Sequence, residues 1–356
     1  MSSPKVLSLD VLEVGGRGGV FQHSLAACIS LADAGHEVRL HTATDCEIED
    51  TRITYCHCFD WKRDSRLRAL RVGFHFVFRT VPHLARQRGD AVWIQGTFKA
   101  FLTVMAIFVL RAAGKMVIFS PHNLFSRTGS KAEARFISQA VKISSKTIVY
   151  NRADADALRS AGIATKFLPL AMYAPIVPAE RLAYWTGELG TKVDSVCSIG
   201  QIRPDKNIGL LIDACRETNT RLVVMGPDAG GQAEARAHVV EGSPTVLWYE
   251  GYYPLEDMAA VIALVGSVAL PYSQASQSAV AELASAYGAT VIAYDTGGLR
   301  DQADILVSTL EVKDWANAIA DRPVNGPSHM QGQSWEPNER LTVNELVTGI
   351  EGLFDA

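Results

Sequence analysis

The stretch from residue 198 to residue 207 reads Ser198-Ile199-Gly200-Gln201-Ile202-Arg203-Pro204-Asp205-Lys206-Asn207. It follows an apolar, β-rich run at 193–199 and precedes an amphipathic run at 208–214, which predicts a loop between a strand and a helix. In doubly wound sheets such loops lie beyond the carboxyl ends of the strands, where ligands bind. Arg203 and Lys206 are therefore candidates to neutralise a diphosphate leaving group. The alternative is that both are solvated loop cations.

The same alternation of strand and helix extends over most of the chain. In the first half, the apolar runs expected to be strands are 6–9, 38–41, 53–55, 92–94, 116–119, 147–150 and 166–168. In the second half they are 193–199, 221–225, 245–248, 267–270, 290–293 and 305–307. Continuous apolar strands separated by helical stretches predict parallel sheets covered on both faces, and hence an α/β fold with two doubly wound, Rossmann-like domains.

Domain boundaries are expected where this alternation breaks. Residues 171–190 contain two prolines and two glycines and no clear strand, which predicts a linker. The expected domains are thus 1–170 and 191–336, facing each other across a cleft, with a loop at 321–333. A final helix at 337–356 is expected to pack back toward the first domain.

Composition indicates a soluble, cytoplasmic protein. The chain has 356 residues, of which 48% are apolar, and its longest apolar run, 101–110, is about half of what a membrane-spanning helix needs. The six cysteines are expected to be free thiols in a reducing compartment. The run Cys56-His57-Cys58 does not match the usual spacing of zinc ligands, so no metal site is expected.

Charge is distributed unevenly. Residues 1–170 carry 23 basic and 14 acidic side chains, whereas the remainder carries 11 basic and 24 acidic ones. A basic half suits an anionic partner. The stretch 61–88 concentrates the basic residues among aromatic ones, namely Lys62, Arg63, Arg66, Arg68, Arg71, Arg79, Arg86 and Arg88 with Phe74, Phe76 and Phe78. This pattern suits a membrane surface or a lipid-phosphate acceptor. No nucleic-acid-binding module accompanies it, and a solvated helix face is the alternative.

A glycine-rich stretch, Gly15-Gly16-Arg17-Gly18-Gly19, follows the first expected strand and opens a helix. Glycines allow the backbone to approach a phosphate or sugar closely, and the helix N-terminus favours negative charge. Gly18 and Gly19 are therefore candidate binding residues, although a plain tight turn explains the pattern equally well.

A polar loop and a short helix follow the expected strand at 267–270. The stretch reads Pro271-Tyr272-Ser273-Gln274-Ala275-Ser276-Gln277-Ser278-Ala279-Val280-Ala281-Glu282. Ser276 or Ser278 is expected to cap the helix, whose free N–H groups would meet phosphate. Glu282 lies among small apolar residues, where a buried carboxylate needs a partner such as a ribose diol. The alternative for Glu282 is a surface or capping role.

His122 follows the expected strand at 116–119 within Ser120-Pro121-His122-Asn123. A histidine at this end of a strand could hydrogen-bond a sugar hydroxyl or transfer a proton. A structural histidine is an equally good explanation.

Together these motifs resemble the GT-B glycosyltransferases, and most closely the family 4 group. The first glycine loop with Leu31-Ala32 and Gly35-His36-Glu37-Val38 resembles that family's first strand–helix–strand. Residues 200–207 resemble its diphosphate-binding loop. Residues 276–282 with Gly288 and Asp295-Thr296-Gly297-Gly298-Leu299 resemble its donor-binding helix and glycine turn. Trp335-Glu336 resembles the segment that crosses back to the first domain. The chain differs in having Gln201 directly after the loop glycine, and Gln274 where the family has the first of two glutamates.

The resemblance implies a hexosyltransferase that uses a UDP- or GDP-sugar as co-substrate and needs no cofactor or metal. Arg203 and Lys206 would bind the diphosphate, Glu282 the ribose and His122 the donor sugar. Gly18, Gly19, Gln274, Ser276, Ser278 and Ala279 would line the donor site. The expected acceptor is a lipid-linked or otherwise anionic glycan precursor of surface polysaccharide, reached by peripheral contact with the inner face of a membrane through 61–88, with no nucleic-acid partner.

Retention of configuration is favoured by analogy, and Glu13, His23 and His122 are the base candidates for inversion. The alternatives are a sugar-nucleotide epimerase or hydrolase and a catalytically silent partner protein.

Overall fold

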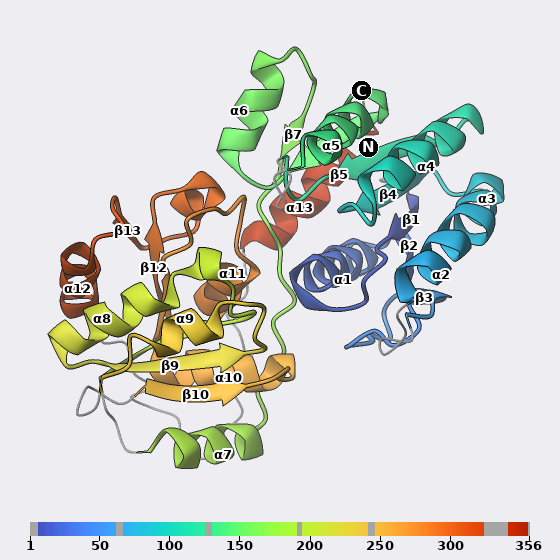
Figure 1. Cartoon of the computed structure of the whole chain (residues 1–356). Coiled ribbons are helices and arrows are strands. Elements are labelled where there is room, and N and C mark those ends of the chain that lie inside the picture. Colours follow the sequence, from blue (N-terminus) through green and yellow to red (C-terminus); the bar gives the residue numbers. More distant parts are fainter. Residues whose placement is uncertain are drawn as a thin grey trace. The chain divides into compact units, whose positions relative to one another are not determined.

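The computed structural model describes residues 6–61, 67–124, 130–190, 194–240, 246–323 and 341–354, with the side chains of 341–343 left out. It divides into two compact units, unit 1 (Met1–Tyr173 and Leu341–Ala356) and unit 2 (Ala174–Arg340) (Figure 1). Lys62, Arg63, Arg66 and the Trp335-Glu336 segment lie outside the described residues, as does most of the loop expected at 321–333.

Unit 1 contains a seven-stranded parallel sheet in the order β3-β2-β1-β4-β5-β6-β7. Its strands are β1 (Ser8–Leu12), β2 (Glu37–Ala43), β3 (Thr54–Phe59), β4 (Ala91–Gln95), β5 (Met116–Ser120), β6 (Lys146–Val149) and β7 (Lys166–Phe167). Its helices are α1 (Gly18–Asp33), α2 (Arg68–His75), η1 (Phe76–Thr80), α3 (Val81–Arg86), α4 (Ala100–Ala112), α5 (Lys131–Ile143), α6 (Arg152–Ser160) and α13 (Leu341–Glu351). Helix α13, at the end of the chain, packs against α1, and His36 Nε2 lies 3.1 Å from Glu351 Oε1.

Helices α2 and α3 are continuous through η1, a single π-helical turn. Pro82 explains the irregularity, because it has no N–H group to complete the regular hydrogen-bonding ladder. The N–H group of Val81 instead reaches back to the carbonyl oxygen of Phe76. The basic and aromatic stretch is thus helical from Arg68 to Arg86, with Val72 and Phe76 buried in the core of unit 1.

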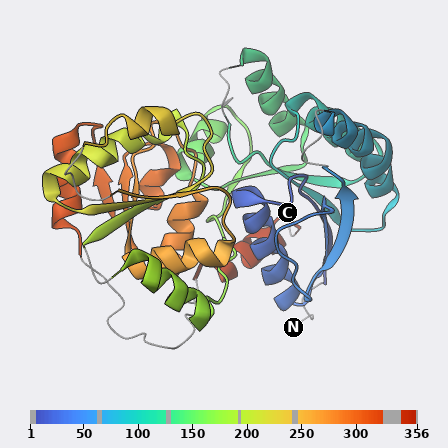
Figure 2. The same ribbon diagram turned by 60° about the horizontal axis from the view of Figure 1, so that its bottom comes forward.

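Unit 2 contains a six-stranded parallel sheet in the order β10-β9-β8-β11-β12-β13. Its strands are β8 (Ser195–Ile199), β9 (Arg221–Gly226), β10 (Val246–Glu250), β11 (Ser267–Leu270), β12 (Thr290–Tyr294) and β13 (Ile305–Val307). Its helices are α7 (Ala179–Leu189), η2 (Pro204–Lys206), α8 (Ile208–Thr218), α9 (Gln232–Arg236), α10 (Leu255–Val265), α11 (Ala279–Ala286), η3 (Gly297–Asp301) and α12 (Val312–Asp321). Helix α12 packs on α8 and α7 packs on α10, as the second view also shows (Figure 2).

The structure confirms the expected strands, because each apolar run overlaps one strand. The ends differ by a few residues. Strand β1, for example, begins at Ser8 rather than at Val6, whose side chain is exposed. The two sheets also confirm the doubly wound α/β fold class.

The prediction of a linker over 171–190 needs correction, because helix α7 occupies most of this range. Pro178 occupies the N-cap and does not interrupt the helix that follows. Leu182 and Trp185, three residues apart and so on one face, are buried. The indole N–H group of Trp185 donates to Asp257 Oδ1 of α10 at 2.9 Å. The helix is therefore an integral part of unit 2.

Candidate functional site

The chain order of unit 2 reverses between the neighbouring strands β8 and β11, and ligands of open α/β sheets bind at such a switch point. The loops that follow these two strands are bonded to each other. Asn207 Nδ2 donates to the carbonyl oxygen of Pro271 at 2.7 Å, and the N–H group of Ser273 donates to that of Asp205 at 2.9 Å. The loops after β8 and β11, which the sequence analysis singled out, are thus joined by hydrogen bonds.

Two glycines permit the close packing of this region. Gly200 has φ +103°, and a Cβ atom there would lie 3.2 Å from Lys206 Nζ and 3.9 Å from a methyl group of Val280. Gly200 therefore lies between the lysine and the first turn of α11. Gly297, with φ +49°, passes so close to Ala275 that a Cβ atom would overlap its carbonyl oxygen. Only glycine fits either position without rearrangement.

Lys206 is the buried cation of the site. Lys206 is only 7% exposed. Its Nζ atom donates to the hydroxyl group of Tyr272 at 2.9 Å and to the carbonyl oxygen of Ile199 at 3.5 Å. Within the described parts of the chain, no carboxylate lies within ion-pair distance of Nζ. A buried charge without a counter-ion is costly, so this arrangement favours an anionic ligand.

Arg203 differs from Lys206 because a carboxylate already neutralises it. Its Nε and Nη2 atoms each donate to an oxygen of Asp205, both at 2.8 Å. This hydrogen-bonded pair raises the pKa of Arg203. Burial opposes ionisation of Asp205, but the hydrogen bonds from Arg203 outweigh it and lower the pKa of Asp205. The sequence did not reveal that the two predicted cations differ in this way.

The N-terminus of α11 presents backbone donors beside Lys206. Ser278 is the N-cap, and its hydroxyl oxygen accepts from the N–H group of Ala281 at 3.3 Å. Among the described residues, the N–H groups of Ala279 and Val280 have no hydrogen-bond partner. Ser276 is buried nearby, whereas Gln274 is exposed. The helix end is therefore suited to an anion.

Glu282 is partly buried on α11 and has a protein partner. Gln302 Nε2 donates to Glu282 Oε1 at 2.9 Å and to the carbonyl oxygen of Ser278 at 3.1 Å. The carbonyl oxygen of the same amide accepts from the N–H group of Ser278 at 2.8 Å. The sequence analysis expected a ribose diol to be the partner of the Glu282 carboxylate. Gln302 provides one such hydrogen bond from within the protein. It also fixes the position of the carboxylate.

In unit 1 the order reverses between β1 and β4, and the glycine loop follows β1. Gly18 and Gly19 are the first residues of α1, and the N-cap Arg17 makes no side-chain hydrogen bond to the first turn. Glu13 accepts from the N–H groups of Gly15 and Gly16 at 2.7 and 2.8 Å and from the hydroxyl of Thr42 at 2.9 Å. Burial raises the pKa of Glu13. Because both its oxygens are engaged, Glu13 shapes the loop rather than serving as a base.

His122 lies in a buried cluster on the same unit. Its φ angle of +57° is unusual for a residue other than glycine and often marks functional positions. Its Nε2 atom lies 2.8 Å from Gln95 Oε1, which also accepts from the hydroxyl of Tyr150 at 3.2 Å. The ring centroids of His122 and His23 are 5.3 Å apart.

Two polar atoms of this cluster have no partner within the described residues, namely His23 Nε2 and Gln95 Nε2. His23 Nδ1 lies 2.7 Å from the carbonyl oxygen of Ala171, so Nδ1 carries the proton and Nε2 is an acceptor. Burial lowers the pKa of His23 to about 4 against the opposing effect of that carbonyl. One acceptor and one donor are thus available for a hydroxyl group or a water molecule.

Four residues that contribute to these clusters were not assigned roles from the sequence: Tyr272, Gln302, Gln95 and Tyr150. Tyr272 and Gln95 had a detectable signal, because each is a polar residue at the carboxyl end of a strand beside a switch point. Gln302 and Tyr150 contact the clusters through tertiary packing alone.

Comparison with known families identifies the chain. A sequence model described as "Glycosyltransferase Family 4" matches residues 17–167, and one described as "Glycosyl transferases group 1" matches residues 194–322. The two matches lie in units 1 and 2 respectively, and together they cover well over half of the chain. The chain is a glycosyltransferase of the family 4 type.

Solved structures similar to this glycosyltransferase share its GT-B fold. HepE of Anabaena in complex with UDP and glucose has a TM-score of 0.66 and 16% identity, over 88% of this chain and 89% of that chain. The catalytic domain of starch synthase IV from Arabidopsis thaliana, bound to ADP and acarbose, has a TM-score of 0.69 and 12% identity, over 99% and 96%. WaaG, a glycosyltransferase involved in lipopolysaccharide biosynthesis, has a TM-score of 0.61 and 14% identity, over 88% and 89%. At these identities the likeness establishes the fold.

No curated protein sequence matches this glycosyltransferase. Among the residues that the structure describes, no helix combines the length and the apolar character needed to cross a membrane.

Proposed function

We propose that this glycosyltransferase transfers a hexose from a UDP- or GDP-sugar to a glycan or lipid-linked acceptor, without a metal ion and with retention of configuration. The buried ammonium group of Lys206 carries the proposal. It lies beside the N-terminus of α11, where the N–H groups of Ala279 and Val280 have no partner among the described residues. It is also at the switch point of the sheet, and its nearest partner is a neutral phenol. A nucleoside diphosphate supplies the missing negative charge.

A protein cation that meets the diphosphate takes the role that a divalent metal has in other phosphate sites. Arg203 contributes less, because Asp205 offsets its charge. Glu282 lies in the first turn of α11, and its carboxylate, which accepts a hydrogen bond from Gln302, is suited to a ribose hydroxyl as well. HepE in complex with UDP and glucose supports a uridine donor by analogy.

Retention is supported by the state of the base candidates. Both oxygens of Glu13 are engaged by the glycine loop and Thr42. His23, with a pKa near 4, is a weak base at neutral pH. His23 Nε2 and Gln95 Nε2, which have no partner in the described part of the chain, instead suit a sugar hydroxyl that donates to the first and accepts from the second. His122 would act with them as a contact to the sugar.

The exposed side chains of unit 1 support contact with an anionic membrane that carries the acceptor. Exposed apolar residues lie on or next to two helices packed together, α2–η1 and α4: Leu67, Leu70, Phe74, Phe78, Phe101, Met105, Phe108 and Val109. Exposed arginines accompany them, including Arg79, Arg86, Arg88 and Arg111. Apolar side chains that insert and cations that meet lipid phosphates are the two components of interfacial binding. This surface includes α4 and so extends beyond the 61–88 stretch.

Calorimetric titration of the purified chain with UDP and with GDP, each with and without magnesium, tests the donor proposal. Saturable binding of one nucleotide, unchanged by magnesium, is the expected result. Absence of binding of either would overturn the proposal in favour of a catalytically silent partner protein. Turnover of the sugar nucleotide without any acceptor would instead indicate an epimerase or hydrolase.

A further inference from the structure

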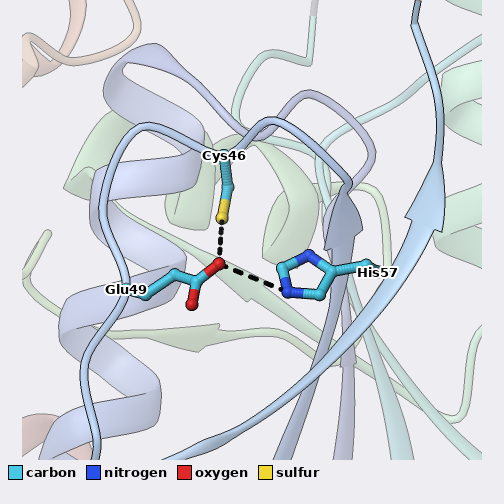
Figure 3. A group of neighbouring side chains, drawn as sticks. All are labelled: Cys46, Glu49 and His57. Carbon is cyan, nitrogen blue, oxygen red and sulfur yellow. Dashed lines mark hydrogen bonds and ion pairs between the residues drawn. The ribbon is translucent and has the colours of Figure 1, made fainter.

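Three side chains that are common metal ligands converge beside the edge strand β3 of unit 1: Cys46, Glu49 and His57 (Figure 3). Cys46 and Glu49 belong to the loop between β2 and β3, and His57 belongs to β3. Cys46 Sγ lies 3.7 Å from Glu49 Oε1, and His57 Nε2 lies 3.3 Å from the same oxygen. One ligand atom from each residue lies within 4.8 Å of the others.

The imidazole of His57 is held in the orientation that a metal ligand requires. Its Nδ1 atom lies 3.2 Å from the carbonyl oxygen of Ala43, so Nδ1–H can donate there and leave the lone pair of Nε2 facing Cys46 and Glu49. The ring of Tyr55 stacks on that of His57, with centroids 5.9 Å apart and planes 11° from parallel. The hydroxyl of Tyr55 in turn accepts from the N–H group of Asp50 at 2.8 Å, which joins the loop to the strand.

This group differs from the Cys56-His57-Cys58 run that the sequence brings to attention. Neighbouring residues of a strand point to opposite faces, so the two cysteines cannot share a metal with His57. Cys58 Sγ lies 3.7 Å from Nδ1 of the buried His41 instead. The expectation that this run is not a metal motif therefore has a structural reason, while His57 finds other partners on its own face.

We propose that Cys46, Glu49 and His57 form a binding site for a divalent cation of the zinc type. Sulfur, nitrogen and oxygen donors together favour Zn²⁺ over Mg²⁺ or Ca²⁺. Tetrahedral zinc with its usual bond lengths places neighbouring ligand atoms about 3.3–3.7 Å apart. The observed separations of 3.3 and 3.7 Å match that spacing. Three protein ligands leave the fourth position for water or another small ligand.

The site would stabilise the loop that supports the glycine-rich turn. The N–H group of Glu47 donates to the carbonyl oxygen of Gly16 at 2.9 Å, and Gln22 Nε2 donates to Glu47 Oε1 at 2.7 Å. Arg17 and Asp45 form an ion pair at 3.2 Å. A cation that joins Cys46 and Glu49 to β3 would fix this loop, and with it the start of α1. It would act as a structural ion in unit 1, so it does not depend on how the donor binds in unit 2.

Titration of the metal-free, tag-free chain with Co²⁺, followed by absorption spectroscopy, tests the proposal. Cobalt replaces zinc in tetrahedral sites, and a bound thiolate produces a ligand-to-metal absorption band. We expect one Co²⁺ per chain, a thiolate band, displacement by Zn²⁺ and release of a proton on binding. Cys46→Ser should abolish the band, and His57→Ala should weaken binding at least about tenfold.

Cys56→Ser is the matched control, because it removes a neighbouring thiol on the other face of β3. Its band and affinity should equal those of the unaltered chain. The proposal is overturned if the unaltered chain gives no thiolate band, if the band persists in Cys46→Ser, or if it disappears in Cys56→Ser. Circular dichroism of each variant establishes that it is folded, and His57→Ala provides a second variant should Cys46→Ser not fold.

Discussion

The Nζ atom of Lys206 lies 2.9 Å from the hydroxyl oxygen of Tyr272 and 4.4 Å from the centroid of its ring. A neutral phenol thus stabilises the buried ammonium group by a hydrogen bond and a cation–π contact. Neither interaction neutralises its charge. The buried charge of Lys206 therefore lowers the stability of the fold but allows the site to bind an anion. Mutation can separate these two effects.

Lys206→Met keeps much of the side-chain length and removes the charge. We expect UDP or GDP affinity to fall about 10²-fold, because one electrostatic donor is lost from a partly dehydrated site. The free energy of unfolding should stay equal or rise by about 1 kcal/mol, because a buried unpaired charge disappears. Calorimetry and urea unfolding measure the two quantities. Lys313→Met, at an exposed position of α12, is the control. Equal nucleotide affinity in Lys206→Met and the unaltered chain would contradict the proposal that Lys206 binds the diphosphate.

Asp205→Asn releases Arg203 from its ion pair. Because Asp205 also places a negative charge near the diphosphate, we expect nucleotide affinity to increase by up to about tenfold and to become more sensitive to salt. The loss of stability should be at most about 1 kcal/mol, since both partners are about one-third exposed. Titration at two ionic strengths measures the change. Weaker binding would mean that Asp205 serves to orient Arg203.

The fold could be predicted well from the sequence because strand–helix alternation is a local pattern. The strand runs, the cation loop at 198–207 and the cap at Ser278 depend on neighbours in sequence. Helix α7 was missed because Pro178 and Gly187 obscured the spacing of Leu182 and Trp185. The partners of Lys206, Glu282 and His57 could not be predicted, because they depend on side-chain packing between segments that only the folded sheet brings together.

Glu282→Ala distinguishes recognition of ribose from recognition of phosphate. If the carboxylate contacts the ribose, UDP or GDP affinity should fall about tenfold, the effect of one charged hydrogen bond, while inorganic pyrophosphate affinity stays the same. Gln302→Ala is the control, because it removes a partner of Glu282 but leaves the carboxylate in place. Gln302→Ala should destabilise α11. It should change the ratio of nucleotide affinity to pyrophosphate affinity less than Glu282→Ala does. A parallel loss of pyrophosphate binding in Glu282→Ala would indicate a structural role.

The buried His23 makes stability depend on pH. Its pKa of about 4 in the folded chain lies below the ordinary value of 6.5, so the unfolded chain binds more protons between these two pH values. Its contribution to stability is therefore complete above pH 6.5 and is lost as the pH falls toward 4, by about 3 kcal/mol in total. His23→Gln removes this titration. Urea unfolding at pH 7 and pH 4.5 should show a smaller loss of stability in the variant, and parallel losses would mean that His23 titrates normally.

The exposed aromatic pair Phe74 and Phe78, with ring centroids 4.7 Å apart, provides a direct test of membrane contact. The two residues are 61% and 64% exposed, and insertion into the lipid interface would remove this apolar surface from water. We expect the chain to sediment with vesicles of phosphatidylcholine and phosphatidylglycerol, less so in high salt, and only weakly with phosphatidylcholine alone.

Phe74→Ser and Phe78→Ser together should lower the affinity for these mixed vesicles at least about tenfold, since each loses about 1 kcal/mol or more of burial. Val240→Ser, an exposed apolar position in unit 2, is the control and should bind as the unaltered chain does. Binding that is equal on both kinds of vesicle and insensitive to salt would reject an anionic membrane as the partner of this surface.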